Sequence, residues 1–129
     1  MHPTMANGKI CYLEIPAADI ARSAEFYRAC FGWEVGKRGD GSTTFNDSVG
    51  QVSGTWVLAP PAPDGPGIRI HIMVADMEQS MKAVVAHGGE IVEPVGKHLP
   101  EITAKFRDPG GNVLGLYQDQ ALWKSTHSE

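Results

Sequence analysis

Two short segments of the chain carry polar side chains at alternate positions of otherwise apolar runs. The first is Tyr12-Leu13-Glu14 and the second is Arg69-Ile70-His71. A carboxylate such as that of Glu14 can orient or charge an imidazole such as that of His71, and such a pair can perform general acid-base catalysis. The same pair can also recognise a ligand or form a plain ion pair, and these two roles are favoured over catalysis.

The guanidinium of Arg69 offers a second kind of chemistry. It can hold a carboxylate or a phosphate through two parallel hydrogen bonds. The alternative is a salt bridge between Arg69 and Glu14. Tyr12 is expected to be either a wall of the same site or a hydrogen-bond donor in it.

The elements that carry these residues follow from the apolar pattern. Alternation of apolar and polar residues predicts strands at 10–15 and 68–74. After each strand an aspartate, Asp19 or Asp76, stands where it would cap a helix, and each helix would run to a glycine, Gly32 or Gly88. Three shorter strand-like runs follow each helix, so the order β-α-β-β-β is predicted twice. These runs are Trp33–Lys37, Thr43–Asn46 and Gln51–Ala59, and then Glu90–Val95, Ile102–Arg107 and Asn112–Gln118.

The two halves form a degenerate repeat. Asp19 matches Asp76, 57 positions later, and further pairs share this offset: Ile15 with Ile72, Ala18 with Ala75, Ser23 with Ser80, Ala29 with Ala86, Gly32 with Gly89 and Val35 with Val92. We therefore expect one domain over residues 1–129, with modules at about 8–59 and 68–118. A proline-rich linker at 60–67 joins the modules, and the tail 119–129 is expected to be loosely held apart from Trp123.

The composition is that of an ordinary globular protein. The hydrophobic share is 42%, the charged share is 20%, and the formal net charge of −4 argues against a nucleic-acid partner. Neither a long apolar run nor a signal-peptide pattern is present, so we expect a cytoplasmic protein with no membrane partner. Cys11 and Cys30 are expected to be buried small apolar residues rather than a disulfide.

Longer strings resemble a known family. Leu13-Glu14-Ile15-Pro16-Ala17-Ala18-Asp19, with Ala24-Glu25-Phe26-Tyr27 and Phe31-Gly32-Trp33, resembles the opening of vicinal oxygen chelate proteins, the superfamily of glyoxalase I, bleomycin-resistance proteins and extradiol dioxygenases. The segments 106–112 and 114–117 resemble its closing hairpin. The resemblance implies an α+β fold, in which two βαβββ modules form a curved mixed sheet, or half-barrel, around a ligand cavity. It identifies the fold more strongly than the reaction.

The resemblance also implies where a metal would bind. In metal-using members, the first and last strands of each half supply four ligands, and these places fall on Tyr12, Gly54, Arg69 and Gly115. Gly54 is placed by matching residues 50–56 of the first half with residues 111–117 of the second, which pairs it with Gly115. Divalent iron, zinc, nickel or manganese wants imidazole and carboxylate donors, whereas glycine offers no side chain and arginine keeps its proton. We therefore expect no metal and no cofactor, which puts lyase and dioxygenase activities in doubt.

The predicted cavity face follows from strand alternation. It carries Glu14 and His71 as the candidate catalytic residues. The candidate ligand-binding residues are Tyr12, Gly54, Trp56, Arg69, Met73, Gly115 and Tyr117. Gly54 and Gly115 are interpreted as making space for a flat or bulky ligand, and the alternative is that both are bulge or twist glycines.

The sequence thus predicts a metal-independent binding protein for a small aromatic or anionic molecule. The alternative is a lyase, isomerase or dioxygenase type enzyme of the same superfamily, acting through Glu14 and His71 or through an atypical metal site. A third reading is a subunit or regulator without a ligand of its own. The resemblance further implies a homodimer, with Trp123 as a candidate interface anchor.

Overall fold

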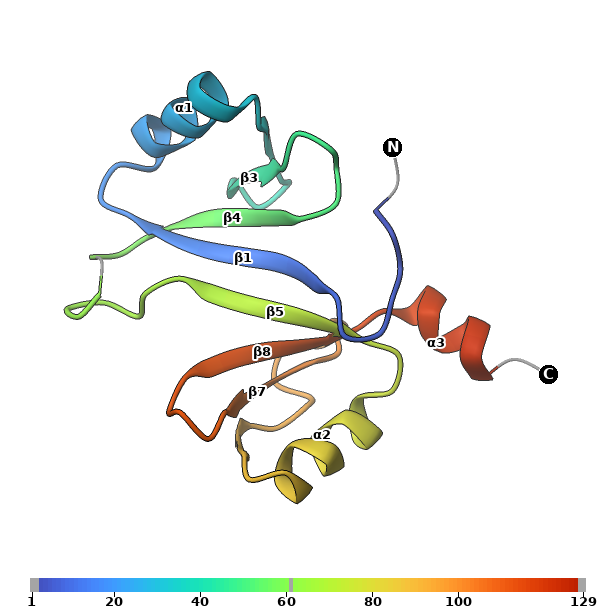
Figure 1. Ribbon diagram of the computed structural model, residues 1–129. Coiled ribbons are helices and arrows are strands. Elements are labelled where there is room, and N and C mark those ends of the chain that lie inside the picture. Colours follow the sequence, from blue (N-terminus) through green and yellow to red (C-terminus); the bar gives the residue numbers. More distant parts are fainter. Residues whose placement is uncertain (1–2, 61, 128–129) are drawn as a thin grey trace. The chain divides into compact units, whose positions relative to one another are not determined.

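A computed structural model of the chain describes residues 3–60 and 62–127. The elements follow the order β-α-β-β-β twice, and a further helix comes at the C-terminal end, so the predicted α+β class and module order are confirmed (Figure 1). The elements are β1 (Ile10–Ala17), α1 (Ile20–Phe31), β2 (Glu34–Lys37), β3 (Thr43–Asn46), β4 (Ser53–Leu58), β5 (Arg69–Val74), α2 (Met77–Ala86), β6 (Glu90–Glu93), β7 (Thr103–Arg107), β8 (Val113–Gln118) and α3 (Gln120–His127).

The chain divides into two compact units whose boundaries differ from those of the predicted modules. Unit 1 contains Met1–Thr4 and Cys11–Ile70, and unit 2 contains Met5–Ile10 and His71–Glu129. The segment before β1 belongs to unit 2 because it is hydrogen-bonded there. The amide of Gly8 donates to the carbonyl of Met73 at 2.7 Å, and the amide of Met73 donates to the carbonyl of Lys9 at 2.8 Å.

In unit 1 the strand order is β2-β3-β4-β1. β1 and β4 run parallel, whereas β3 is antiparallel to both β2 and β4. α1 begins where the Asp19 carboxylate accepts the amide of Arg22 at 3.1 Å. It ends at Gly32, whose left-handed backbone (φ 71°) few other residues would adopt without strain. The helix packs against β4, β3 and β2 (Figure 1).

The core of unit 1 is a chain of aromatic rings under α1. The ring of Trp33 stacks on Tyr27 at 4.6 Å and on Phe45 at 4.5 Å between centroids, and Phe45 lies 4.9 Å from Trp56. Phe45 and Trp56 are each only 2% exposed. Pairs of this kind contribute about 0.5–1.5 kcal/mol each beyond the area that they bury. Residues from α1, β3 and β4 are therefore joined in one aromatic cluster.

Gly54 makes this cluster possible. A Cβ placed on Gly54 would lie 2.3 Å from Phe45 Cζ and 2.3 Å from the backbone oxygen of Leu13. Gly54 is the register partner of Phe45 on β3 and of Leu13 on β1. The ring of Phe45 thus lies directly on the bare backbone of β4.

Unit 2 has the strand order β5-β8-β7-β6, with β5 and β8 parallel. Asp76 caps α2 by accepting the amide of Gln79 at 3.1 Å. Under α2 lies a smaller aliphatic core, whose buried members are Val74, Met77, Ala104 and Leu116. The modules therefore share a topology but differ in core composition.

The described part of the C-terminal tail contains a helix that the sequence analysis did not predict, α3. Asp119 is 9% exposed, and its carboxylate accepts the amide of Leu122 at 3.0 Å, as an N-cap residue does. The cysteines also differ from expectation. Neither is in a disulfide, but Cys30 on α1 is exposed and Cys11 is half-buried.

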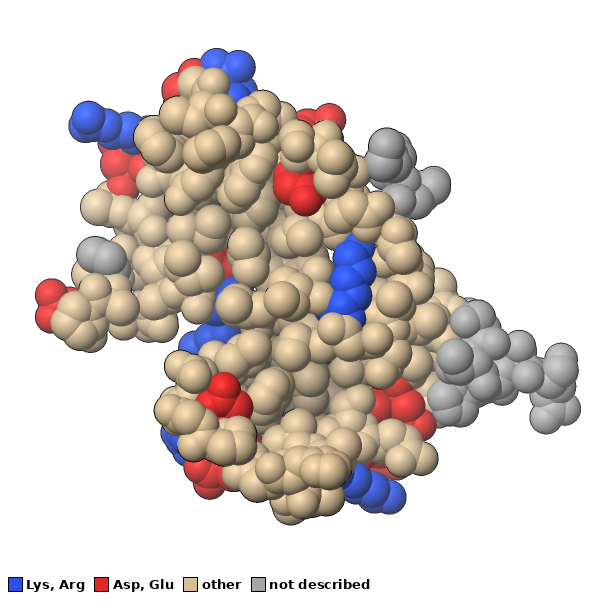
Figure 2. Space-filling model, viewed as in Figure 1, with Lys and Arg blue, Asp and Glu red and all other residues tan. Residues whose placement is uncertain are grey.

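Two surface properties of the described chain can be compared with the sequence. No helix in residues 3–60 and 62–127 is long and apolar enough to cross a membrane. On the face shown in Figure 2, acidic and basic side chains are scattered among uncharged ones. This distribution agrees with the small net charge.

The Gly54–Phe45 contact generates a stability prediction. Gly54→Ala should lower the free energy of unfolding by about 1–3 kcal/mol, because the added methyl overlaps a buried ring and a backbone oxygen that cannot both move away. Urea denaturation followed by tryptophan fluorescence measures this loss. Gly36→Ala on β2 is the matched control, since a Cβ there meets only Thr44 Oγ1 at 3.5 Å. Equal effects of the two substitutions would contradict the close approach.

Candidate functional site

The face of unit 1 turned away from α1 carries Tyr12 and Glu14. They alternate along β1 with Leu13 and Ile15, which pack in the core. In the parallel register, Tyr12 lies opposite Ser53 and Glu14 lies opposite Thr55. The side chains of β4 that share the face of Tyr12 and Glu14 are therefore those of Ser53 and Thr55.

The predicted placement of Trp56 and Gly54 on this face is wrong. Trp56 is the register partner of Ile15 and lies in the same core cluster. Gly54 gives its free space to Phe45 and not to a ligand on the opposite face. The sequence comparison between the halves had aligned Gly54 with Gly115. In the structure, Thr55 opposite Glu14 corresponds to Gly115 opposite His71. A shift of one residue in a strand exchanges its two faces.

A residue that the sequence analysis missed, Arg38, contacts Tyr12. It follows β2, and its Nη2 donates a hydrogen bond to the phenol oxygen of Tyr12 at 2.5 Å. The guanidinium carbon also lies 5.4 Å from the centre of the Tyr12 ring, which is cation–π distance. Nothing in the sequence pattern joins these two residues, which are 26 positions apart with α1 between them. Only the adjacent basic pair of Lys37 and Arg38 could have suggested a cationic site.

Burial dominates the ionisation of Tyr12. Desolvation raises the pKa of its phenol above the ordinary value of 10.0, while the hydrogen bond and the positive charge of Arg38 oppose this rise. The negative charge of Glu14 raises the pKa further. Burial therefore favours the neutral phenol of Tyr12 over the phenolate.

Arg69 begins β5 and is half-buried. The ion pairs found among the described residues do not include Arg69. Arg69 and Ile70 cluster with unit 1, whereas the rest of β5 belongs to unit 2.

In unit 2, four predicted residues lie on the face turned away from α2. His71 is opposite Gly115, and Met73 is opposite Tyr117, on the parallel strands β5 and β8. Their neighbours Ile72, Val74 and Leu116 pack on α2, so the alternation in this half is the predicted one. Met73 is buried, at 4% exposed, while His71 and Tyr117 are half-buried.

The imidazole of His71 lies on the bare backbone of Gly115. A Cβ placed on Gly115 would come within 2.2 Å of His71 Nδ1 and 2.5 Å of its Cε1. The space that a side chain at position 115 would enter is therefore filled by the histidine ring. Gly115 thus makes room for the imidazole of His71, a residue of its own unit. This role differs from that of a glycine that only allows the strand to bulge or twist.

The donor groups at the family's metal-ligand places do not fit a metal. Tyr12 is held by Arg38, Arg69 is cationic, and position 115 has no side chain. Thr55, which replaces Gly54 as the place in β4, donates its hydroxyl to the carbonyl of Thr43 at 2.8 Å. None of these groups is the imidazole or carboxylate that a divalent transition metal prefers. Within the described residues, no three His, Cys, Asp or Glu side chains come together as a metal site would require.

Comparison with known proteins identifies the class to which this fold and these strands belong. Residues 9–116 match the Glyoxalase/Bleomycin resistance protein/Dioxygenase superfamily, and the chain belongs to that family. A protein of Didymella fabae described as a "Glyoxylase-like domain-containing protein" is 30% identical over 121 residues. The match covers 85% of this chain and 93% of that protein.

Solved structures share the fold at lower identity. Methylmalonyl-CoA epimerase from Mycobacterium tuberculosis superposes with a TM-score of 0.63 and 14% identity, over 89% of this chain and 92% of that one. A superfamily member from Vibrio splendidus 12B01 superposes with a TM-score of 0.58 and 20% identity, over 88% and 100%. At these identities the likeness concerns the fold and not the reaction.

The contact between His71 and Gly115 can be tested by a double-mutant cycle. Gly115→Ala should destabilise the protein when His71 is present and have little effect in a His71→Ala background, because the three atoms nearest to the added methyl all belong to the imidazole. We expect a coupling energy of about 1 kcal/mol or more, measured by urea denaturation of the four proteins. Additive effects of the two substitutions would rule out the contact.

The Tyr12–Arg38 pair leads to a prediction about ionisation. Arg38→Gln should raise the pKa of Tyr12 further, because it removes a hydrogen bond and a positive charge that favour the phenolate. The ultraviolet absorbance of tyrosinate, with a Tyr12→Phe variant as reference, reports this pKa.

The raised pKa of Tyr12 also makes the stability of the protein depend on pH. The free energy that burial of the neutral phenol contributes is fully present below pH 10, and it is lost as the pH rises through the pKa of Tyr12 in the folded protein. In Arg22→Gln, a control on α1, the pKa of Tyr12 should not move; a fall of that pKa in Arg38→Gln would contradict the assignment.

Proposed function

We propose that this chain is a metal-independent member of its superfamily that binds a small aromatic or anionic molecule. The observation that carries the proposal is the position of His71 on Gly115. Metal-using relatives need a donor side chain at this place, and here the imidazole fills the space in which such a side chain would begin. Binding without a metal requires only shape, apolar surface and a few fixed polar groups.

The charge of the ligand is inferred from the arginines of unit 1. Arg69 is half-buried and in no ion pair within the described chain, and Arg38 lies on the ring of Tyr12. A guanidinium holds a carboxylate or phosphate with two hydrogen bonds, and a hydrogen bond to a charged group is worth about 1.5–3 kcal/mol. We assign the anionic group of the ligand to Arg69.

A second candidate is an enzyme that uses His71 as a general base or acid. The observation that favours it is again the contact with Gly115, since a ring held against a strand keeps one orientation, as a proton-transferring group must. The two candidates differ in one respect. An enzyme would lose turnover but keep ligand affinity in His71→Gln, whereas a binding protein has no turnover to lose.

Benzoate and benzyl alcohol form a matched pair of probes for the binding proposal, because they share a ring and differ in charge. We expect benzoate to bind more tightly by isothermal titration calorimetry, and Arg69→Gln to weaken benzoate binding about 10-fold or more while leaving benzyl alcohol unaffected. Arg22→Gln, an exposed arginine of α1, is the control. Unchanged benzoate affinity in Arg69→Gln, or no binding of either probe, would refute the assignment.

We further propose that the protein works in the cytoplasm as a homodimer. Native mass spectrometry of freshly purified protein tests the dimer and the metal together, because it reports subunit number and any bound ion. We expect twice the mass of one chain and no metal. A stoichiometric transition metal would overturn the metal-independent proposal, and a single-chain mass would overturn the dimer.

A further inference from the structure

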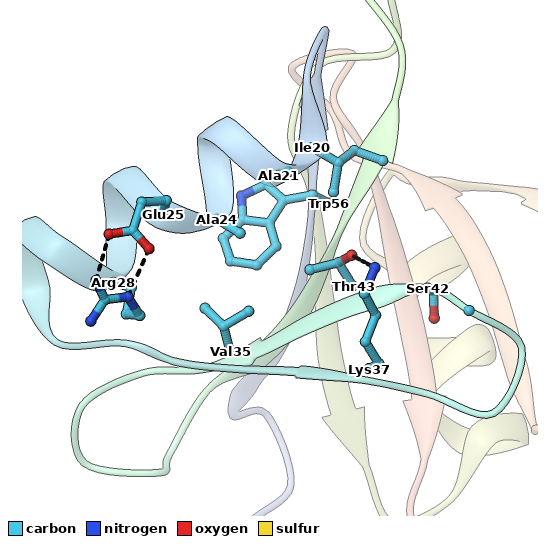
Figure 3. Close-up of a pocket in the computed structure, with 11 residues that line it drawn as sticks. Ile20, Ala21, Ala24, Glu25, Arg28, Val35, Lys37, Ser42, Thr43 and Trp56 are labelled. Carbon is cyan, nitrogen blue, oxygen red and sulfur yellow. Dashed lines mark hydrogen bonds and ion pairs between the residues drawn. The ribbon is translucent and has the colours of Figure 1, made fainter.

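Unit 1 contains a cleft on the other side of its sheet, between α1 and the β2–β3 hairpin (Figure 3). Its volume is about 530 Å³, within the range of about 300–1,000 Å³ common for small-molecule sites. Apolar side chains from α1 and β2 form its walls, namely Ile20, Ala21, Ala24 and Val35. The indole of Trp56 projects from β4 into the gap between the helix and the hairpin.

One end of the cleft is cationic. Lys37 Nζ donates a hydrogen bond to Thr43 Oγ1 at 2.8 Å and has no carboxylate partner within the described chain. At the other end, Arg28 and Glu25 form an ion pair at 2.5 Å, so their charges cancel. Ser42 also lines the cleft and donates its hydroxyl to Asp40, which is not among the lining residues. The lining residues therefore carry one uncompensated positive charge, that of Lys37.

The indole N–H of Trp56 is an independent sign that the packing here is incomplete. The side chain is 2% exposed, and Nε1 has no hydrogen-bond partner among the described residues. A buried donor left unsatisfied costs about 1–3 kcal/mol. In Figure 3 the nitrogen lies on the edge of the ring nearest α1. A ligand that packs against the indole of Trp56 can therefore change the environment of this unsatisfied N–H group.

We propose that this cleft binds a small monocarboxylate with an apolar body. The carboxylate lies against Lys37, where charge complementarity favours an anion over a neutral or cationic group. The apolar body lies along the helix wall and the indole of Trp56. The site is separate from the one assigned under the proposed function, because Tyr12 is on the opposite face of β1 from the core in which Trp56 lies.

Octanoate and 1-octanol test this site, because they share a chain and differ in the carboxylate. Titration of ¹⁵N-labelled protein with octanoate should shift the indole N–H resonance of Trp56, which is assigned by its absence from a Trp56→Phe variant. Lys37→Gln should raise the Kd for octanoate about 10-fold and leave the binding of octanol unchanged. Lys82→Gln, an exposed lysine of α2, is the matched control and should change neither.

A second variant closes the cleft. Ala21 is exposed on α1, and Ala21→Phe should occupy the volume beside Trp56 without disturbing the core, so that both probes lose binding while the circular dichroism spectrum stays native. If octanoate leaves the Trp56 resonance unmoved, or if its Kd is the same in Lys37→Gln, the proposal is wrong. Arg69→Gln should not change octanoate binding, so failure of this site and failure of the proposed function are distinguishable.

Discussion

Much of unit 1 depends on one contact, the ring of Phe45 lying on the bare backbone of Gly54. Any side chain at position 54 would displace this ring. Because Phe45 stacks on Trp33, and Trp33 stacks on Tyr27 of α1, this contact sets how closely the helix approaches the sheet. It also fixes which residues of β4 face the helix. Ser53 and Thr55 are thereby left on the opposite face beside Tyr12 and Glu14.

In unit 2, too, an aromatic ring packs on the backbone of a glycine, but on the other face of the strands. There a glycine of the last strand, Gly115, receives the imidazole of His71 on the face away from the helix. In unit 1 the ring on the bare backbone belongs to the core under α1, whereas in unit 2 it lies on the sheet face turned away from α2. Two related modules have thus kept their topology while placing their glycines on opposite sides of the sheet.

This difference explains what the sequence could and could not predict. Strand alternation and the aspartate caps predicted the two βαβββ modules, because these signals depend on neighbouring residues. The face of Gly54 depended on an alignment between halves, and one residue of error reversed it. Polar and apolar positions alternate along β4, and this alternation alone would have placed Gly54 on the core face. It pairs Gly54 with Trp56, and Ser53 with Thr55. The contact between Arg38 and Tyr12 could not be predicted, since it joins the end of β2 to β1, which come together only through the order of the strands in the sheet.

The segment before β1 belongs to the second unit, although it precedes the first unit in the sequence. Residues 5–10 belong to unit 2, where Gly8 and Lys9 are hydrogen-bonded to Met73, although residues 11–70 of unit 1 separate them from it along the sequence. The second copy is therefore discontinuous, and a fragment starting in the proline-rich linker would lack one of its own hydrogen-bonded edges. A duplication that copied one contiguous stretch of sequence would therefore not by itself produce unit 2 as it now stands, because part of that unit precedes β1.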